Sequence, residues 1–347
     1  MVEGLLLEDA GVRRRWSEFI KVLSEQSVEL GVRAQALESA TRDQLLAALL
    51  IILAKAGMQD QPSSRRTFDL AERMGLHVLP VTFYSPVPEL GKLRDSTWDS
   101  AYGEGWEPEE ERQLGLLQDL SSWNPELVSI PREPEPDAPH QYYWTNLSFN
   151  AVDAAIYYSM IRHVRPRRIL EVGAGLSTMI AAQAARANGD TRVDCIEPYP
   201  GDVLAAGFPG LSRLIREPVQ DVPIDEFLAL DSNDILFVDS THVSKIGSDV
   251  NYLILRVLPR LRAGVIIHFH DVFLPWEYPR HWILNERIFW NEQYLLLAFM
   301  MFNRDFQTLL ANHYLGHKYP DLYRARFPVL TVSGQGGSFW IQRKLAE

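Results

Sequence analysis

The sequence predicts an α/β fold: a doubly wound sheet, mostly parallel with an antiparallel last strand, follows an N-terminal, mainly helical region. Two observations support this fold class. In the second part of the chain, short apolar runs alternate with helical segments, which is the pattern of parallel β-α-β units. A glycine turn at Gly173 and Gly175 follows the first of these runs. Sheets of this kind bind ligands at the carboxyl ends of their strands, where such a turn lies.

The N-terminal region is predicted to be helical because its apolar residues recur at spacings of three and four. The predicted helices are Val12–Leu23, Thr41–Ala56 and Arg66–Met74. The prolines of Pro131–Pro139 exclude a regular helix or a central strand, since each lacks a backbone donor. We therefore expect a linker there and two domains, an accessory region of residues 1–140 and an α/β domain of residues 141–347.

The α/β region contains apolar runs that suit strands buried on both faces of a sheet. The predicted strands are Arg167–Val172, Val193–Glu197, Asp234–Asp239, Gly264–Asp271, Phe306–Leu310 and Ser338–Gln342. The predicted helices are Asn150–His163, Ser177–Ala187, Val250–Leu261 and Glu286–Phe302. In this arrangement the carboxyl ends of the strands meet at one edge of the sheet.

The composition restricts the classes of partner. The net charge of −11, from 45 acidic against 34 basic residues, argues against a nucleic-acid partner. Cys195 is the only cysteine, so an intramolecular disulfide and a multi-cysteine zinc site are excluded and a cytoplasmic location is expected. The most apolar stretch, Leu45–Ala54, rises only about 15 Å as a helix, so it predicts a buried helix rather than a membrane span. The N-terminal helices could also form a homo-oligomer interface.

The glycine turn carries the strongest local signal for a ligand. Glu171 precedes Gly173 and Gly175, and Thr178 stands where a dinucleotide-binding turn has glycine or alanine. A carboxylate at this point repels a pyrophosphate but can hold the ammonium group of S-adenosylmethionine. Glu197, at the tip of the second strand, is placed to accept two ribose hydroxyls, a feature that NAD-binding proteins share.

The order of the motifs resembles that of a known family. EVGAG, IEP, VQD, FVDSTH and HFHD follow one another as in class I S-adenosylmethionine-dependent methyltransferases. More narrowly, the chain is similar to bacterial small-molecule O-methyltransferases from about Pro80 to the C-terminus. The resemblance implies a Rossmann-like fold with S-adenosyl-L-methionine as methyl donor. The cofactor-binding residues that it implies are Glu171, Gly173, Gly175, Ser177, Glu197, Gln220, Asp221 and Asp239.

A second polar cluster follows the fourth and fifth strands. Asp239 ends the fourth strand and His242 lies three residues on, while His268, His270 and Asp271 end the fifth strand. Strand alternation predicts His268 and His270 on one face and Asp271 on the other. Three histidines and two acids at adjacent strand tips predict a functional site.

Two versions of the chemistry remain open. By resemblance to metal-dependent catechol and macrolide-sugar O-methyltransferases, Asp239, His270 and Asp271 would bind a divalent metal, and His242 would fall where a catalytic lysine is found. A histidine ligand favours manganese, iron or zinc over magnesium. In the metal-free version, His242 or His270 acts as general base beside Asp239. The predicted catalytic residues are therefore His242, His270 and Asp239.

The predicted reaction is methyl transfer to a hydroxyl oxygen of a small molecule by direct displacement at the methyl carbon. The alternatives are N-methylation or a macromolecular acceptor, an NAD-linked oxidoreductase, and a non-catalytic nucleoside-binding module. Aromatic residues could line an acceptor pocket or simply pack on the sheet. They are Trp276, Tyr278, His281 and Trp282, with Tyr84, Tyr142, Tyr143 and Trp144 from the N-terminal part.

Overall fold

The computed structural model describes residues 68–69, 72–73, 75, 77, 81–330 and 336–345. The chain divides into two compact units, Met1–Arg94 and Asp95–Glu347. The described part of the first unit includes a short 3-10 helix, η2 (Leu90–Lys92). The helices predicted at Val12–Leu23 and Thr41–Ala56 lie outside the described residues, and only isolated positions of Arg66–Met74 are described.

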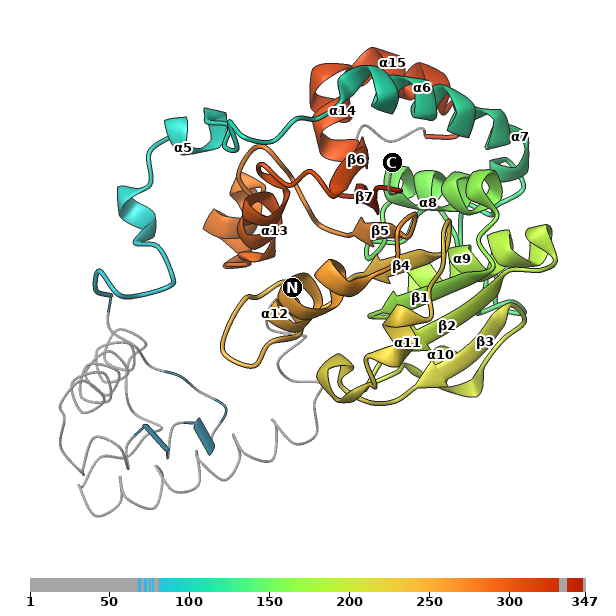
Figure 1. Ribbon diagram of the computed structural model, residues 1–347, viewed down its shortest axis with the longest axis horizontal. Coiled ribbons are helices and arrows are strands. Elements are labelled where there is room, and N and C mark those ends of the chain that lie inside the picture. The colour runs from blue at the N-terminus through green and yellow to red at the C-terminus, as the bar shows by residue number, and fades with distance from the viewer. Residues whose placement is uncertain are drawn as a thin grey trace, which may run out of the picture. The chain divides into compact units, whose positions relative to one another are not determined.

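The second unit contains a seven-stranded sheet in the order β3-β2-β1-β4-β5-β7-β6 (Figure 1). The strands are β1 (Arg168–Val172), β2 (Arg192–Ile196), β3 (Leu211–Ile215), β4 (Ile235–Val238), β5 (Ile266–Phe269), β6 (Phe306–Ala311) and β7 (Phe339–Arg343). The first five strands pair in parallel, whereas β7 pairs antiparallel with both β5 and β6. The predicted sheet, mostly parallel with an antiparallel last strand, is confirmed.

Helices cover both faces of this sheet. The described helices of the second unit are, in chain order, α5 (Ser96–Asp99), α6 (Glu110–Leu120), η3 (Ser121–Trp123), α7 (Asn124–Leu127), α8 (Ala151–Val164), α9 (Leu176–Asn188), α10 (Asp202–Ala206), η4 (Val219–Asp221), α11 (Asp225–Leu228), α12 (Asp249–Tyr252), η5 (Leu253–Val257), η6 (Leu258–Arg260), η7 (Trp282–Glu286), α13 (Glu292–Met300), α14 (Asn312–Lys318) and α15 (Pro320–Arg326). Among the helices that the structure describes, none is long and apolar enough to cross a bilayer.

Two apolar cores follow from the alternation of side chains along the buried strands. On one face, Ile169 and Phe237 pack with α8, α9 and α6. On the other, Leu170 and Leu236 pack with η5 and α13. Because each strand contributes to both cores, the sequence reads as continuous apolar runs rather than as alternation of apolar and polar residues.

Local signals explain where the helices next to the site begin and end. The side chain of Asn150 caps α8 by accepting hydrogen bonds from the backbone N–H groups of Val152 and Asp153. Arg165 ends the same helix in the left-handed conformation, with φ of 48°. Gly189, with φ of 91°, ends α9 in the same way. The sequence predictions for both helices agree with the structure to within one residue at each end.

Two helix predictions are wrong in part. The segment predicted as one helix over Val250–Leu261 is helical but changes from α12 to the π-helix η5 and the 3-10 helix η6. Pro259 lies in η6 and cannot donate the bond that would continue an α-helix. The helix predicted over Glu286–Phe302 begins only at Glu292, because Arg287 adopts φ of 62° and ends the preceding turn.

One strand was not predicted. β3 is one of the two edge strands of the sheet, and its LSRLI sequence mixes polar with apolar residues because the strand is only partly buried. The apolar-run criterion that identifies the central strands therefore does not apply to it.

Within the second unit, α6 lies before the sheet in the sequence and packs against its core. Leu117 and Leu120 of α6 are buried in the core beside α8, and the side-chain oxygen of Gln113 accepts a hydrogen bond from the backbone N–H of Ala311 at 2.8 Å. Residues 131–139 contain no helix or strand, as their prolines predict. A domain boundary between residues 140 and 141 stays a prediction.

Candidate active site

The turn after β1 brings the ends of β1 and β4 into contact at Gly173. The backbone of Gly173 has φ of 82°, and a Cβ atom there would lie 1.7 Å from the backbone oxygen of Asp239. The backbone N–H of Asp239 also donates a hydrogen bond to the carbonyl of Val172, the last residue of β1, at 2.8 Å. Only glycine fits a position with this conformation and this close approach.

A cavity of about 420 Å³ opens at the carboxyl ends of β1, β2 and β4. Its lining combines apolar side chains with polar groups. The lining residues are Val172, Gly173, Ile196, Glu197, Pro198, Tyr199, Pro218, Val219, Gln220, Asp239, Ser240, Thr241, Lys245, Gly247, Ser248 and Asp249. An apolar lining with a few polar groups is typical of a small-molecule site.

Glu197 is held in this cavity by backbone donors. One oxygen of its carboxylate accepts a hydrogen bond from the N–H of Tyr199 at 2.8 Å, and the other accepts one from the N–H of Ala174 at 3.4 Å. Each oxygen keeps a further lone pair, so the carboxylate can still accept from the two hydroxyls of a vicinal diol. The amide of Gln220 donates to the carbonyl of Gly247 at 3.0 Å and links two other residues of the lining.

Glu171 does not line this cavity. Its side chain is fully buried below the glycine turn. The hydroxyl of Tyr157 donates to one carboxylate oxygen at 2.9 Å, and the thiol of Cys195 donates to the other at 3.4 Å. Burial raises the pKa of Glu171 to about 7. These contacts support the turn from beneath rather than face a ligand.

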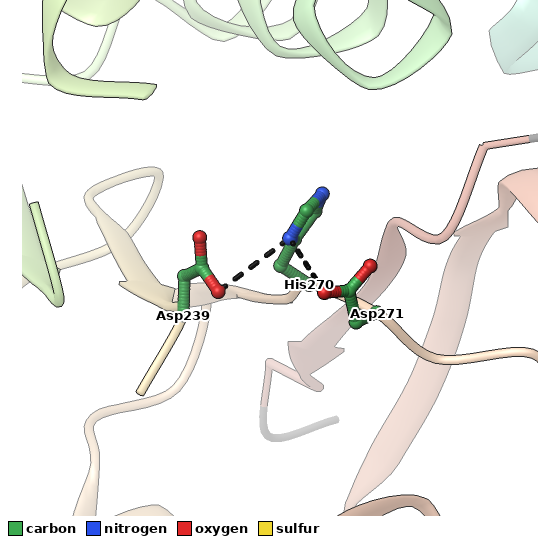
Figure 2. A group of neighbouring side chains, drawn as sticks. All are labelled: Asp239, His270 and Asp271. Atoms are coloured by element: carbon green, nitrogen blue, oxygen red, sulfur yellow. Dashed lines mark ion pairs between the residues drawn. The ribbon is translucent and has the colours of Figure 1, made fainter. Parts of the chain in front are cut away.

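Asp239, His270 and Asp271 come together beside the cavity (Figure 2). The Nδ1 atom of His270 lies 3.5 Å from a carboxylate oxygen of Asp239 and 3.5 Å from one of Asp271. One ligand atom from each residue falls within 4.8 Å of the others. Asp271 reaches this side of the sheet, against the alternation rule, because its φ of 56° turns the chain just past the end of β5.

The second ring nitrogen of His270 faces Asp153 of α8, with Nε2 and a carboxylate oxygen 3.3 Å apart. Asp153 is fully buried and accepts hydrogen bonds from the N–H groups of Gly337 and Ser338 and from the amide of Asn312. Both nitrogens of His270 are within ion-pair distance of carboxylates, yet neither has a hydrogen bond of good geometry. The ring is therefore buried with its polar atoms incompletely satisfied.

His242 bridges two carboxylates. Its Nε2 lies 3.1 Å from Asp239 and its Nδ1 lies 2.9 Å from Glu292 of α13, while the ring of Trp290 packs against the imidazole at 4.2 Å between centroids. Burial opposes protonation, but the two carboxylates outweigh it and raise the pKa of His242 to about 10. Both ring nitrogens are thus engaged.

The charges of the six ionisable groups around Asp239 and His270 do not balance. Burial raises the pKa of both Asp271 and Glu292, so keeping these groups ionised requires nearby positive charge. Even with both imidazoles protonated, four carboxylates leave an excess of two negative charges. The six groups are Asp153, Asp239, Asp271, Glu292, His242 and His270. The donor set and its charge fit a divalent cation.

His268 belongs to the core and not to this cluster. Its Nε2 pairs with the hydroxyl of Ser338 at 2.8 Å, and its ring stacks on Phe237 at 4.2 Å between centroids. Burial, with the charge of His270, holds its pKa well below the ordinary range. These contacts describe a neutral, structural histidine.

Sequence comparisons assign the family. A protein-family model described as a methyltransferase domain matches residues 170–272, which include the glycine turn, Glu197, Asp239 and His270. An uncharacterized protein of Archaeoglobus fulgidus is 35% identical over 168 residues, a stretch that covers 45% of this chain and 75% of that protein. The chain belongs to the methyltransferases.

This methyltransferase is similar to solved structures of other methyltransferases. The O-methyltransferase TomG from Streptomyces achromogenes, in complex with SAM, aligns over 71% of this chain and 100% of its own, with 14% identity and a TM-score of 0.36. An O-methyltransferase from Bacillus cereus, in complex with SAH, aligns over 66% and 91%, with 12% identity and a TM-score of 0.34. Because these TM-scores are low, the family assignment depends on the sequence matches.

The structure of this methyltransferase gathers about half of the predicted cofactor residues. Four of them line the cavity: Gly173, Glu197, Gln220 and Asp239. Glu171, Gly175, Ser177 and Asp221 are not among its lining residues. All three predicted metal ligands meet, and His242 joins them through Asp239. The roles predicted for these residues stay predictions.

Two residues of the cluster were missed from the sequence. Asp153 lies at the third position of α8 after its cap, Asn150, so its sequence context indicates only helix capping. Glu292 lies within the predicted helix Glu286–Phe302, for which the sequence predicts no role in the site. Both reach the strand tips from helices distant in sequence, a placement that no local pattern reveals.

Proposed function

We propose that this methyltransferase transfers the methyl group of S-adenosylmethionine to a hydroxyl oxygen of a small-molecule acceptor, with a divalent cation bound by Asp239, His270 and Asp271. One observation carries the proposal. Asp239 both lines the cavity and belongs to the three-residue cluster. The donor cavity and the cluster therefore share a wall, which is where a methyl group and its acceptor have to meet.

The cavity offers groups that suit the methyl donor. Glu197 keeps lone pairs for the ribose hydroxyls, and the apolar residues Ile196 and Val219 suit an adenine ring. Gly173 keeps the turn free of a side chain. We assign Glu171 the role of supporting this turn, because its carboxylate is buried and already bonded. A direct contact of Glu171 with the ammonium group would require those bonds to break.

Asp239, His270 and Asp271 together offer a cation one nitrogen and two oxygen ligands. Manganese, iron and zinc accept such a mixed set more readily than magnesium. Asp153, opposite the other nitrogen of His270, would orient the ring so that Nδ1 faces the cation, as carboxylate–histidine pairs do in metal sites. When bound, the cation would lower the pKa of the acceptor hydroxyl.

The metal-free version is less well supported. A general base has to be unprotonated before the reaction, but carboxylates raise the pKa of His242 to about 10 and that of His270 well above its ordinary value, although burial opposes both shifts. Both rings would then carry a proton at neutral pH. We therefore assign His242 to positioning Asp239 rather than to removing the proton.

The chemical step is a direct displacement. A bond forms between the acceptor oxygen and the methyl carbon while the carbon–sulfur bond breaks, and the sulfonium becomes a neutral thioether. The acceptor proton leaves to solvent or to a neighbouring carboxylate. What the protein supplies is alignment of the two reactants in an enclosed site.

The aromatic residues that could line an acceptor pocket divide into two groups. Tyr278 is buried and its hydroxyl accepts from the N–H of Gln293, and Trp276 packs on His317; these contacts are structural. Trp282 is only partly buried and lies against Phe273 and Trp290 near the cluster. It is the better candidate for contact with the acceptor.

Binding and turnover test separate parts of the proposal. In calorimetry, S-adenosylhomocysteine is expected to bind, and NAD is not. After chelation, formation of S-adenosylhomocysteine in the presence of sugar and phenol acceptors is expected to fall at least about tenfold and to return with manganese. The matched variants are His270→Ala, expected to lose this response, and His163→Ala on an exposed face of α8, expected to keep it. Turnover that is insensitive to chelation contradicts the metal.

A further inference from the structure

The first turn of α13 contacts both loops that carry the site. The loop after β4 contains Asp239 and His242, and the loop after β5 contains His270 and Asp271. Three consecutive residues, Asn291, Glu292 and Gln293, bond to these loops through side chains and backbone. We call these three residues the α13 clamp.

The first two clamp residues hold the loop after β4. The backbone N–H groups of Asn291 and Glu292 both donate to the carbonyl of His242 at 3.1 Å. The side-chain oxygen of Asn291 accepts from the N–H of Ser244 at 2.6 Å, and the carboxylate of Glu292 binds the ring of His242 at 2.9 Å. His242 adopts φ of 58°, an unusual conformation for histidine that these bonds stabilise.

The third clamp residue holds the loop after β5. The side-chain oxygen of Gln293 accepts from the N–H of Phe273 at 2.9 Å, and its amide donates to the carbonyl of Trp276 at 3.1 Å. Its own N–H donates to the hydroxyl of Tyr278 at 3.2 Å. Glu292 and Gln293 are both buried, so water does not compete with these bonds.

We infer that the α13 clamp is a positioning element that sets the spacing between Asp239 and the pair His270 and Asp271, with Glu292 acting through His242 on the carboxylate of Asp239. The chain of contacts runs from Glu292 to Nδ1 of His242 and from its Nε2 to Asp239. Loss of the Glu292 charge would free the ring to turn and leave Asp239 without a fixed partner. The effect on a cation rests on the proposed function, whereas the effect on the two loops does not.

Two measurements on Glu292→Gln test this inference. The affinity for Mn²⁺, followed by electron paramagnetic resonance, is expected to fall about 10–100-fold, as for other residues that orient metal ligands. Hydrogen exchange of the peptide 240–248 is expected to accelerate, while peptides from α8 and α9 stay as in the wild type. The double variant with His242→Asn is expected to bind Mn²⁺ no more weakly than the weaker single variant, because both act along one path.

The control is Glu286→Gln, the same chemical change at an exposed glutamate that lies 3.9 Å from the exposed His281. It is expected to alter neither readout. Unchanged hydrogen exchange of residues 240–248 in Glu292→Gln overturns the inference. A double variant whose loss of Mn²⁺ affinity equals the product of the losses in the two single variants also overturns it. If the wild type binds no Mn²⁺ but Glu292→Gln still loosens the loop, the metal proposal fails and the clamp stands.

Discussion

Among single residues, Glu171 has a carboxyl group that titrates close to neutral pH. It is a fully buried carboxyl group whose pKa burial raises from 4.5 to about 7. The folded protein therefore binds this proton more tightly than the unfolded chain does. The stability contributed by the protonated group is complete below the unfolded pKa, and it is lost as the pH rises from about 4.5 to about 7.

This titration gives the first prediction. A shift of this size corresponds to about 3 kcal/mol in the free energy of unfolding between pH 4.5 and pH 8. Glu171→Gln keeps an acceptor for the hydroxyl of Tyr157 but cannot titrate, so its stability is expected to fall less than that of the wild type over this range. Urea unfolding at pH 5 and pH 8 measures the difference. Equal losses in the two proteins would show that Glu171 is already ionised in the folded state.

The turn between β1 and α9 shows how one element positions the site. Its two glycines have different roles. At Gly173 an added Cβ atom would overlap the backbone of Asp239, and φ is 82°. At Gly175 the backbone is extended, with φ of 179°, and an added Cβ atom would meet nothing within 4 Å.

This contrast gives the second prediction. Gly173→Ala is expected to destabilise the protein by about 2–4 kcal/mol through strain and overlap, and to lower the Tm by about 5 °C or more. Gly175→Ala is expected to stay within about 0.5 kcal/mol of the wild type. Thermal unfolding of the two variants side by side provides the measurement. Equal stability of both variants would mean that the ends of β1 and β4 are not packed as described.

The whole molecule raises the question of where the folding unit begins. Sequence reasoning predicts a boundary after residue 140, whereas the compact unit extends from Asp95. Leu117 and Leu120 of α6 are buried in the core, and the side-chain oxygen of Gln113 accepts a hydrogen bond from the backbone N–H of Ala311. A chain that begins at residue 141 would expose this surface of the core to water.

This gives the third prediction, in which two fragments are compared. Residues 95–347 are expected to fold cooperatively and to bind S-adenosylhomocysteine with an affinity within about threefold of the full chain. Residues 141–347 are expected to be unfolded or aggregated, because the α6 contacts are lost. Circular dichroism and calorimetry of both fragments decide the matter. A well-folded, binding-competent 141–347 fragment would support the boundary predicted from the sequence instead.

The sequence predicted the sheet well because its central strands are apolar on both faces and its turns carry glycine. The grouping of Asp239, His270 and Asp271 came from the resemblance to metal-dependent O-methyltransferases, whereas strand alternation alone predicts Asp271 on the other face. The sequence could not predict Asp153 or Glu292, whose contacts depend on how α8 and α13 pack. Nor could it predict that Asp271 breaks alternation, since a left-handed backbone at one aspartate leaves no mark in the sequence.

The central claim is that a methyl-donor cavity and a cation site share Asp239. A crystal structure with S-adenosylhomocysteine and Mn²⁺ tests it most directly, through the anomalous signal of the metal. We expect the nucleoside between Gly173 and Glu197, and one manganese peak within coordination distance of Asp239, His270 Nδ1 and Asp271. Bound S-adenosylhomocysteine with no manganese peak at these three residues, or with the peak elsewhere, would show that the cavity and a cation site do not share Asp239.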